Sequence, residues 1–127
     1  DEIEYISILS KKNNNDRLSS LYLSDPSFKS SPQFLADSVY VMDDNEYLLD
    51  ANHVWIPDRN IILYIKEINA QNYSLFSYSI DQMKETAVLI PGYEGSLRHI
   101  GVSPEGDRIV LCDKVGTNII VGDLIFR

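Results

Sequence analysis

The stretch of residues 96–124 constrains the fold most, because short apolar runs alternate in it with turn signals. The apolar runs lie at 97–102, 108–113 and 119–124. Between the first two lies a turn in which the proline presets its own φ and the glycine can adopt a positive φ, Ser103-Pro104-Glu105-Gly106-Asp107. Apolar runs of this length between such turns are typical of β-strands. The stretch therefore predicts three antiparallel strands.

The rest of the chain shows the same alternation, and no window has a sustained apolar period of about 3.6 residues. The run at 61–65 is continuous and rich in Ile, which predicts a central strand buried on both faces, with a polar loop after it at 66–72. Phe28 and Phe34 are expected to pin the Ser- and Pro-rich connection between two strands to the core. The sequence predicts an all-β chain, with further strands at 3–9, 18–23, 38–42, 47–49, 53–56, 73–80 and 86–90.

Composition fits a single globular domain and argues against several classes of partner. The 127 residues are 44% hydrophobic, enough for one core. The net charge of −8 argues against nucleic acid and against an anionic membrane surface, because no basic cluster exceeds the pair Lys11-Lys12. Cys112 is the only cysteine, so the disulfide-rich secreted class is excluded. No apolar run approaches the length of a membrane span.

Two segments of the chain can be overlaid as a repeat. Residues 53–64 match residues 100–112 with one residue inserted in the second turn, and Pro57 and Pro104 lie 47 residues apart. The strands that follow, at 73–78 and 119–124, correspond as well. The expected strands then group into three units of four, four and three strands, at residues 1–51, 52–95 and 96–127.

This grouping resembles the blades of a β-propeller of the WD40-like and TolB-type repeat. The resemblance rests on a strand, a Ser-Pro-acidic-Gly turn, an Ile- and Val-rich strand and a strand that closes on Asp123-Leu124, and it covers about residues 52–124. The chain lacks the Trp-Asp dipeptide and the Gly-His pair of WD40 repeats, and the turn at 57–60 has no glycine. The resemblance implies antiparallel four-stranded blades. A small antiparallel β-barrel or sandwich is the alternative.

Three units are too few for a closed propeller, which has about four to eight blades. The chain is therefore expected to be a fragment of a longer protein, or to form a propeller that a partner or a second copy completes. An isolated trio would leave strand edges exposed. The strand at 3–9 is the nearest candidate to cover the open edge of the strand at 119–124.

Chemistry-bearing residues form no recognisable catalytic or metal-ligating pattern. His53, His99 and the single cysteine have no zinc spacing, and the acidic turn at 43–50 lacks the ligand spacing of a calcium loop. Ser103 sits in a strand-turn-strand sequence rather than in the strand-to-helix turn of a nucleophile elbow. No catalytic, cofactor-binding or metal-binding residue is expected, and the chain is not expected to be an enzyme.

The tract at 93–99 is the candidate for a contact with another protein. It places Tyr93, Arg98 and His99 in or next to a loop between two expected units, and Trp55 is a further candidate. The alternative is structural: Tyr93 packs on the neighbouring unit, Arg98 pairs with a carboxylate and Trp55 belongs to the core.

The function expected from these features is that of a non-enzymatic scaffold for protein–protein interaction within a multiprotein complex. WD40-like repeats mostly bind other proteins, so the resemblance implies a protein partner or self-association, without a cofactor, nucleic acid or membrane, and an intracellular location is favoured. One alternative is an accessory propeller of a larger enzyme, such as a serine peptidase of the prolyl-oligopeptidase kind. Another is an extracytoplasmic ligand-binding β-domain.

Overall fold

The computed structural model describes residues 5–11, 18–40, 53–70, 72–113 and 118–126. Over these residues the chain forms ten β-strands and no helix, which confirms the all-β prediction. The strands are β1 (Ile6–Lys11), β2 (Leu18–Ser24), β3 (Gln33–Tyr40), β4 (His53–Ile56), β5 (Ile61–Asn69), β6 (Asn72–Ser79), β7 (Lys84–Ala87), β8 (Leu97–Val102), β9 (Arg108–Asp113) and β10 (Ile119–Asp123).

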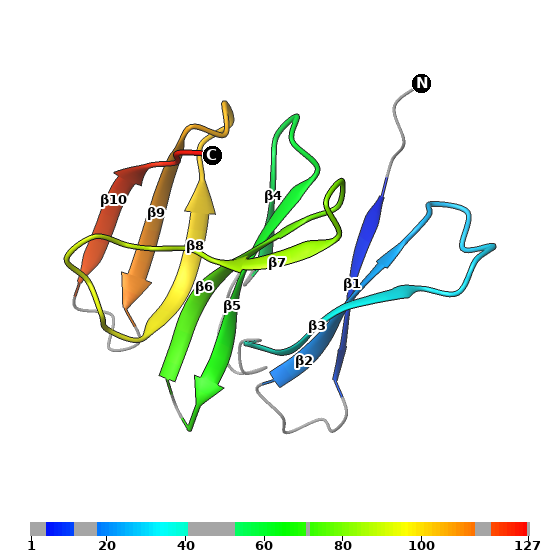
Figure 1. Cartoon of the computed structure of the whole chain (residues 1–127), viewed down its shortest axis with the longest axis horizontal. Helices are drawn as coiled ribbons and strands as arrows, with labels where there is room; N and C mark the ends of the chain where they lie inside the picture. Colours follow the sequence, from blue (N-terminus) through cyan, green and yellow to red (C-terminus); the bar gives the residue numbers. More distant parts are fainter. Residues whose placement is uncertain (1–4, 12–17, 41–52, 71, 114–117, 127) are drawn as a thin grey trace, which may run out of the picture.

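The strands form three antiparallel meanders, shown side by side in Figure 1. The first meander is β1–β2–β3, the second is β4–β5–β6–β7 and the third is β8–β9–β10. A single residue pair, Val39 opposite Lys66, joins the first meander to the second in one seven-stranded sheet, whereas the third forms a sheet of its own. Neither sheet closes on itself over the described residues, so these strands do not form a barrel.

The second meander is covered on both of its faces. Its central strand β5 sends alternate side chains to opposite sides, as any strand does. Leu63 and Ile65 pack in a cluster with residues of β8 and β9, whereas Ile62 and Tyr64 pack in a second cluster with residues of β2 and β3. These four side chains are at most 2% exposed. The prediction of a central strand buried on both faces is confirmed, and the meanders form three layers.

Strand pairing corrects the overlay of the two repeated segments. Trp55 lies opposite Ile62 in the second meander, and Val102 lies opposite Ile109 in the third. Both pairs span the same length of chain, so the two hairpins align without a gap at an offset of 47 residues. The expected one-residue insertion is wrong. A run of neighbouring Ile residues fits equally well one position along, and only the pairing shows which Ile faces which layer.

Backbone hydrogen bonds recur at equivalent places in the two meanders. The Asn60 carbonyl accepts from the Ile80 amide at 2.9 Å, and the Asp107 carbonyl accepts from the Leu124 amide at 2.8 Å. The turns repeat a second bond, in which the amides of Arg59 and Gly106 donate to the carbonyls of Ile56 and Ser103, respectively. The repeat is therefore a property of the fold as well as of the sequence.

Two strands run at least four residues beyond their predicted bounds. β3 begins at Gln33 rather than at residue 38, and β5 continues to Asn69 through residues expected to be a loop. β3 pairs with β2 through two register shifts, so Leu35 and Ala36 are both buried and the strict alternation that periodicity detects is lost. The polar end of β5 still pairs with β6, at Lys66 opposite Ser74 and Glu67 opposite Tyr73.

Two expectations about packing are wrong. Phe28 and Phe34 are 59% and 54% exposed, so they do not pin the connection to the core. Phe34 lies opposite Tyr22 on the face of the first meander that points away from the second, and the two rings meet edge to face at 5.8 Å. In addition, β1 pairs with β2 and lies at the opposite end of the molecule from β10, so it does not cover the edge of β10 (Figure 1). The strand expected at 47–49 and the acidic turn lie outside the described residues.

Candidate protein-contact site

A pocket of about 510 Å³ opens where the chain leaves β7 and crosses to β8. One wall is the start of β6, and the other is the connection after β7. The amide of Val88 donates to the carbonyl of Leu75 at 2.9 Å, which holds the first part of this connection beside β6. Leu89, next along, is 89% exposed. The pocket is lined by Ser74, Leu75, Val88, Leu89, Ile90, Gly92, Tyr93, Glu94, Gly95 and Leu97.

A tight turn at Pro91-Gly92 presents Tyr93 to this pocket. The amide of Tyr93 donates to the carbonyl of Ile90 at 3.1 Å, and Gly92 has a φ of 76°. A type II turn requires a residue with positive φ, usually glycine, at its third position, and proline is common at its second. The sequence Pro-Gly thus determines where the ring of Tyr93 leaves the backbone.

Local contacts hold the ring of Tyr93 in place. Its hydroxyl donates to the carbonyl of Ser96 at 3.3 Å, and Ser96 Oγ accepts from the amide of Tyr73 at 2.9 Å, which ties the loop to β6. A Cβ placed on Gly95 would overlap the ring, so the ring lies directly over this glycine. Burial and, second, the carboxylate of Asp113 raise the pKa of Tyr93 above its ordinary value. The hydroxyl, which is protonated at neutral pH even at the ordinary tyrosine pKa, remains a donor.

Arg98 and His99 lie on β8, next to the pocket rather than in its lining. Leu97 pairs with Asp113 and His99 pairs with Cys112, so Arg98 is the extra residue of a β-bulge. Both side chains are half-buried. The structure thus brings Tyr93 to a pocket and places Arg98 and His99 on the strand that follows it. Their role in protein binding stays a prediction.

Trp55 lies apart from Tyr93, on the other face of the second meander. It packs against the cluster formed with the first meander, whereas Tyr93 packs against the cluster formed with the third. Its Nε1 donates to Ser7 Oγ at 3.2 Å, and the same hydroxyl lies 2.9 Å from His53 Nε2. Trp55 therefore joins two layers of the fold, and its proposed role as a contact residue is likewise untested.

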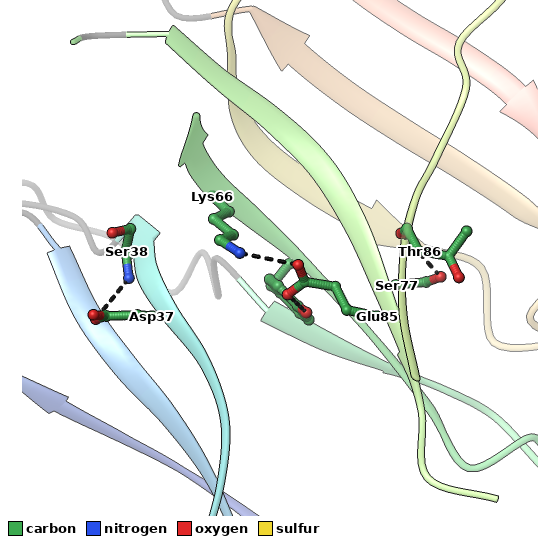
Figure 2. A network of polar contacts seen from close by, with 7 residues as sticks. Asp37, Ser38, Lys66, Ser77, Glu85 and Thr86 are labelled. Atoms are coloured by element: carbon green, nitrogen blue, oxygen red, sulfur yellow. Dashed lines mark hydrogen bonds and ion pairs between the residues drawn. The ribbon is translucent and has the colours of Figure 1, made fainter. Parts of the chain in front are cut away.

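A polar network that sequence analysis does not single out joins β5 to β7. Lys66 Nζ lies 2.9 Å from Glu85 Oε1, and Figure 2 shows the two side chains pointing toward each other. The buried hydroxyl of Tyr64 donates to the other carboxylate oxygen of Glu85. Burial and, second, this carboxylate raise the pKa of Tyr64 well above its usual range. Only the pairing of β5 with β6 and of β6 with β7 brings Glu85 to Tyr64, so the sequence alone gives no signal for this contact.

Ser103 and Cys112, which were considered for catalysis and for metal binding, have the surroundings of residues that support the fold. Within the described part of the chain, no three His, Cys, Asp or Glu side chains gather as a metal site. Ser103 Oγ donates to Asp107 Oδ1 at 2.8 Å and accepts from the amide of Arg108 at 3.0 Å, which identifies it as a turn residue. Cys112 is a half-buried free thiol. Among the described residues there is no helix long and apolar enough to cross a membrane.

Comparison with protein-family models, with curated proteins and with solved structures finds no match. The repeat, the layers and the pocket are therefore the features of this chain that bear on its function.

Proposed function

We propose that the chain is a non-enzymatic module for protein–protein interaction, built of propeller-type blades and acting as a scaffold within a larger assembly. One observation carries the proposal: two adjacent meanders repeat the same strand pairing at an offset of 47 residues, and the loop that joins them carries an open pocket with an aromatic ring. Successive four-stranded antiparallel sheets are the building unit of propellers. Loops held by such a rigid framework are common places for binding residues.

The chemistry of the pocket suits an apolar side chain of a partner protein. Leu89 and Tyr93 offer apolar surface, while Ser74 and Glu94 add polar groups to the lining. Tyrosine is enriched among the residues that dominate binding energy, because its ring buries a large area and its hydroxyl keeps a partner. The ring of Tyr93 is already held by Ser96 and Gly95, so little side-chain entropy is lost on binding.

The test is capture of partners from the native source with the tagged chain, followed by mass spectrometry and by affinity measurement with the partner identified. Tyr93→Ala should weaken binding at least about tenfold, as expected for a central aromatic contact. Gly95→Ala should have the same direction of effect, because its Cβ displaces the Tyr93 ring without removing it. Arg98→Ala tests the predicted contribution of the neighbouring strand.

Gly122→Ala is the matched control for the glycine variant, since a Cβ there meets nothing within 4 Å. It should leave the affinity unchanged. Full binding by both Tyr93→Ala and Gly95→Ala, with the fold intact by circular dichroism, would show that the pocket is not the contact site.

A ligand-binding β-domain is the second candidate, and the pocket is the observation that favours it. Its volume of about 510 Å³ lies within the range of about 300–1,000 Å³ usual for small-molecule sites. A screen of metabolites and short peptides by thermal shift tests it. A compound that raises the melting temperature of the wild-type chain but not of Tyr93→Ala would support this candidate over a protein partner.

A further inference from the structure

The third meander has an apolar outer face that the described residues leave open. Val110 and Val121 lie opposite each other on β9 and β10, and Cys112 lies opposite Ile119. Val110, Val121 and Ile119 are 41%, 64% and 69% exposed. The alternate residues Ile109 and Leu111 point the other way, into the core with the second meander. A flat apolar surface across neighbouring strands is typical of an interaction surface.

The repeat identifies the kind of surface that covers this face. At the offset of 47 residues, Val110 corresponds to Leu63 and Cys112 to Ile65. Leu63 and Ile65 are 2% and 0% exposed, because the third meander covers them with an apolar sheet face. The same position is thus covered in one copy of the repeat, whereas in the next the described residues leave it open. By this equivalence, the matching occupant of the open face is another sheet of the same kind.

The chain itself offers such a sheet face at its other end. On the first meander, Ile8 lies opposite Tyr22 and Tyr22 lies opposite Phe34, so the three side chains form a row across β1, β2 and β3. Phe34 is 54% exposed. This row points away from the second meander, because Leu21 and Leu23 occupy the facing side. Figure 1 shows the first and third meanders at opposite ends of the molecule.

We propose that the outer face of the third meander binds the outer face of the first meander of a second copy. The contact is heterologous, since two different faces meet, and it repeats the layer-on-layer packing found twice within the chain. The inference rests on the propeller-type assignment made above. On that assignment the three described meanders of two copies give six blades, within the range of about four to eight for closed propellers, whereas three copies would give too many. The assembly expected of these 127 residues is therefore a closed dimer.

Sedimentation velocity and light scattering of the purified chain test this proposal. The wild-type chain should be a dimer over a hundredfold range of concentration, and Val121→Lys and Phe34→Lys should each raise the dimer dissociation constant by about 100-fold or more, because each places a charge in both contacts of the closed ring. Both positions are exposed, so circular dichroism should show an unchanged fold. Met83→Lys, in the exposed turn between β6 and β7 of the second meander, is the control and should remain dimeric.

A mixture of the two variants separates this arrangement from other dimers. Val121→Lys retains a good first-meander face and Phe34→Lys retains a good third-meander face, so an equimolar mixture should form a heterodimer through one intact contact. If the dimer instead formed by a symmetric contact between two third meanders, Phe34→Lys would remain dimeric. Mixing would then not bring Val121→Lys back into a dimer, and this result would overturn the proposal. A monomeric wild-type chain would overturn it as well. Tyr93→Ala should stay dimeric, so loss of partner binding at the pocket is distinguishable from loss of self-association.

Discussion

The second and third meanders have the same strand pairing but different surroundings. β5 is buried on both faces, whereas its counterpart β9 alternates between buried and exposed side chains. The sequence does not show this difference: β5 begins Ile-Ile-Leu-Tyr-Ile, and β9 also contains a continuous apolar run, Ile-Val-Leu-Cys. A continuous apolar run is typical of a strand covered on both sides, and alternation is typical of one covered on a single side. By this criterion β9 carries the apolar side chains of an inner layer, although the described residues cover only one of its faces.

The largest predicted difference between the two meanders is in the loss of stability caused by Leu63→Ala and by Val110→Ala. The two residues occupy equivalent positions, but Leu63 is 2% exposed and Val110 is 41% exposed. Leu63→Ala should lower the free energy of unfolding by about 3 kcal/mol, the scale of a buried leucine that leaves a cavity. Val110→Ala should change it by less than about 1 kcal/mol in the monomer. Denaturant titration of both variants at a concentration that favours the monomer provides the measurement, and equal losses would contradict the assignment of inner and outer layers.

Tyr64→Phe tests a feature that only the second meander has. Tyr64 corresponds to Leu111 in the third meander, so the hydroxyl and its bond to Glu85 have no counterpart there. Loss of a hydrogen bond to a half-buried carboxylate should cost about 1.5 kcal/mol of unfolding free energy. Glu85 retains its ion pair with Lys66 at 2.9 Å, which limits the effect.

A double-mutant cycle with Glu85→Ala isolates the contact between the two side chains. The coupling free energy between Tyr64→Phe and Glu85→Ala should be favourable and near the cost of the single tyrosine change. A coupling near zero would mean that the hydroxyl contributes through packing alone.

The same contrast explains how much of the fold the sequence could predict. The predicted bounds of the strands at 53–56, 97–102 and 108–113 are correct to the residue. In both repeats a proline directly after or shortly after the first strand marks where the chain turns. Phe34 is misplaced because periodicity places a residue on a face without showing whether a layer covers that face. The position of Tyr93 in a loop could be predicted, but its pocket could not, since Ser74 and Leu75 reach it only through the pairing of β6 with the connection after β7.

The junction between the first and second meanders gives the smallest predicted effect, a dependence of stability on pH. Burial lowers the pKa of His53 below its ordinary value of 6.5. At pH values between the lowered pKa of folded His53 and 6.5, the unfolded chain therefore binds more protons than the folded chain. The stability contributed by neutral His53 is therefore complete above about pH 6.5 and is lost as the pH falls through this window. The equivalent position in the third meander is Ile100, which cannot titrate.

Thermal melting between about pH 7.5 and about pH 5.5 measures this dependence, in the window where histidine titrates. The melting temperature of the wild-type chain should fall across the window, and His53→Gln should show a smaller fall, because an amide keeps a hydrogen-bonding group beside Ser7 without taking up a proton. Ser7→Ala is the matched control: it removes the hydroxyl that contacts both His53 and Trp55 and should lower stability at every pH. Since burial causes the lowered pKa, Ser7→Ala should retain the slope. A slope equal in the wild-type chain and in His53→Gln would show that the contact between the two layers does not depend on the protonation of His53.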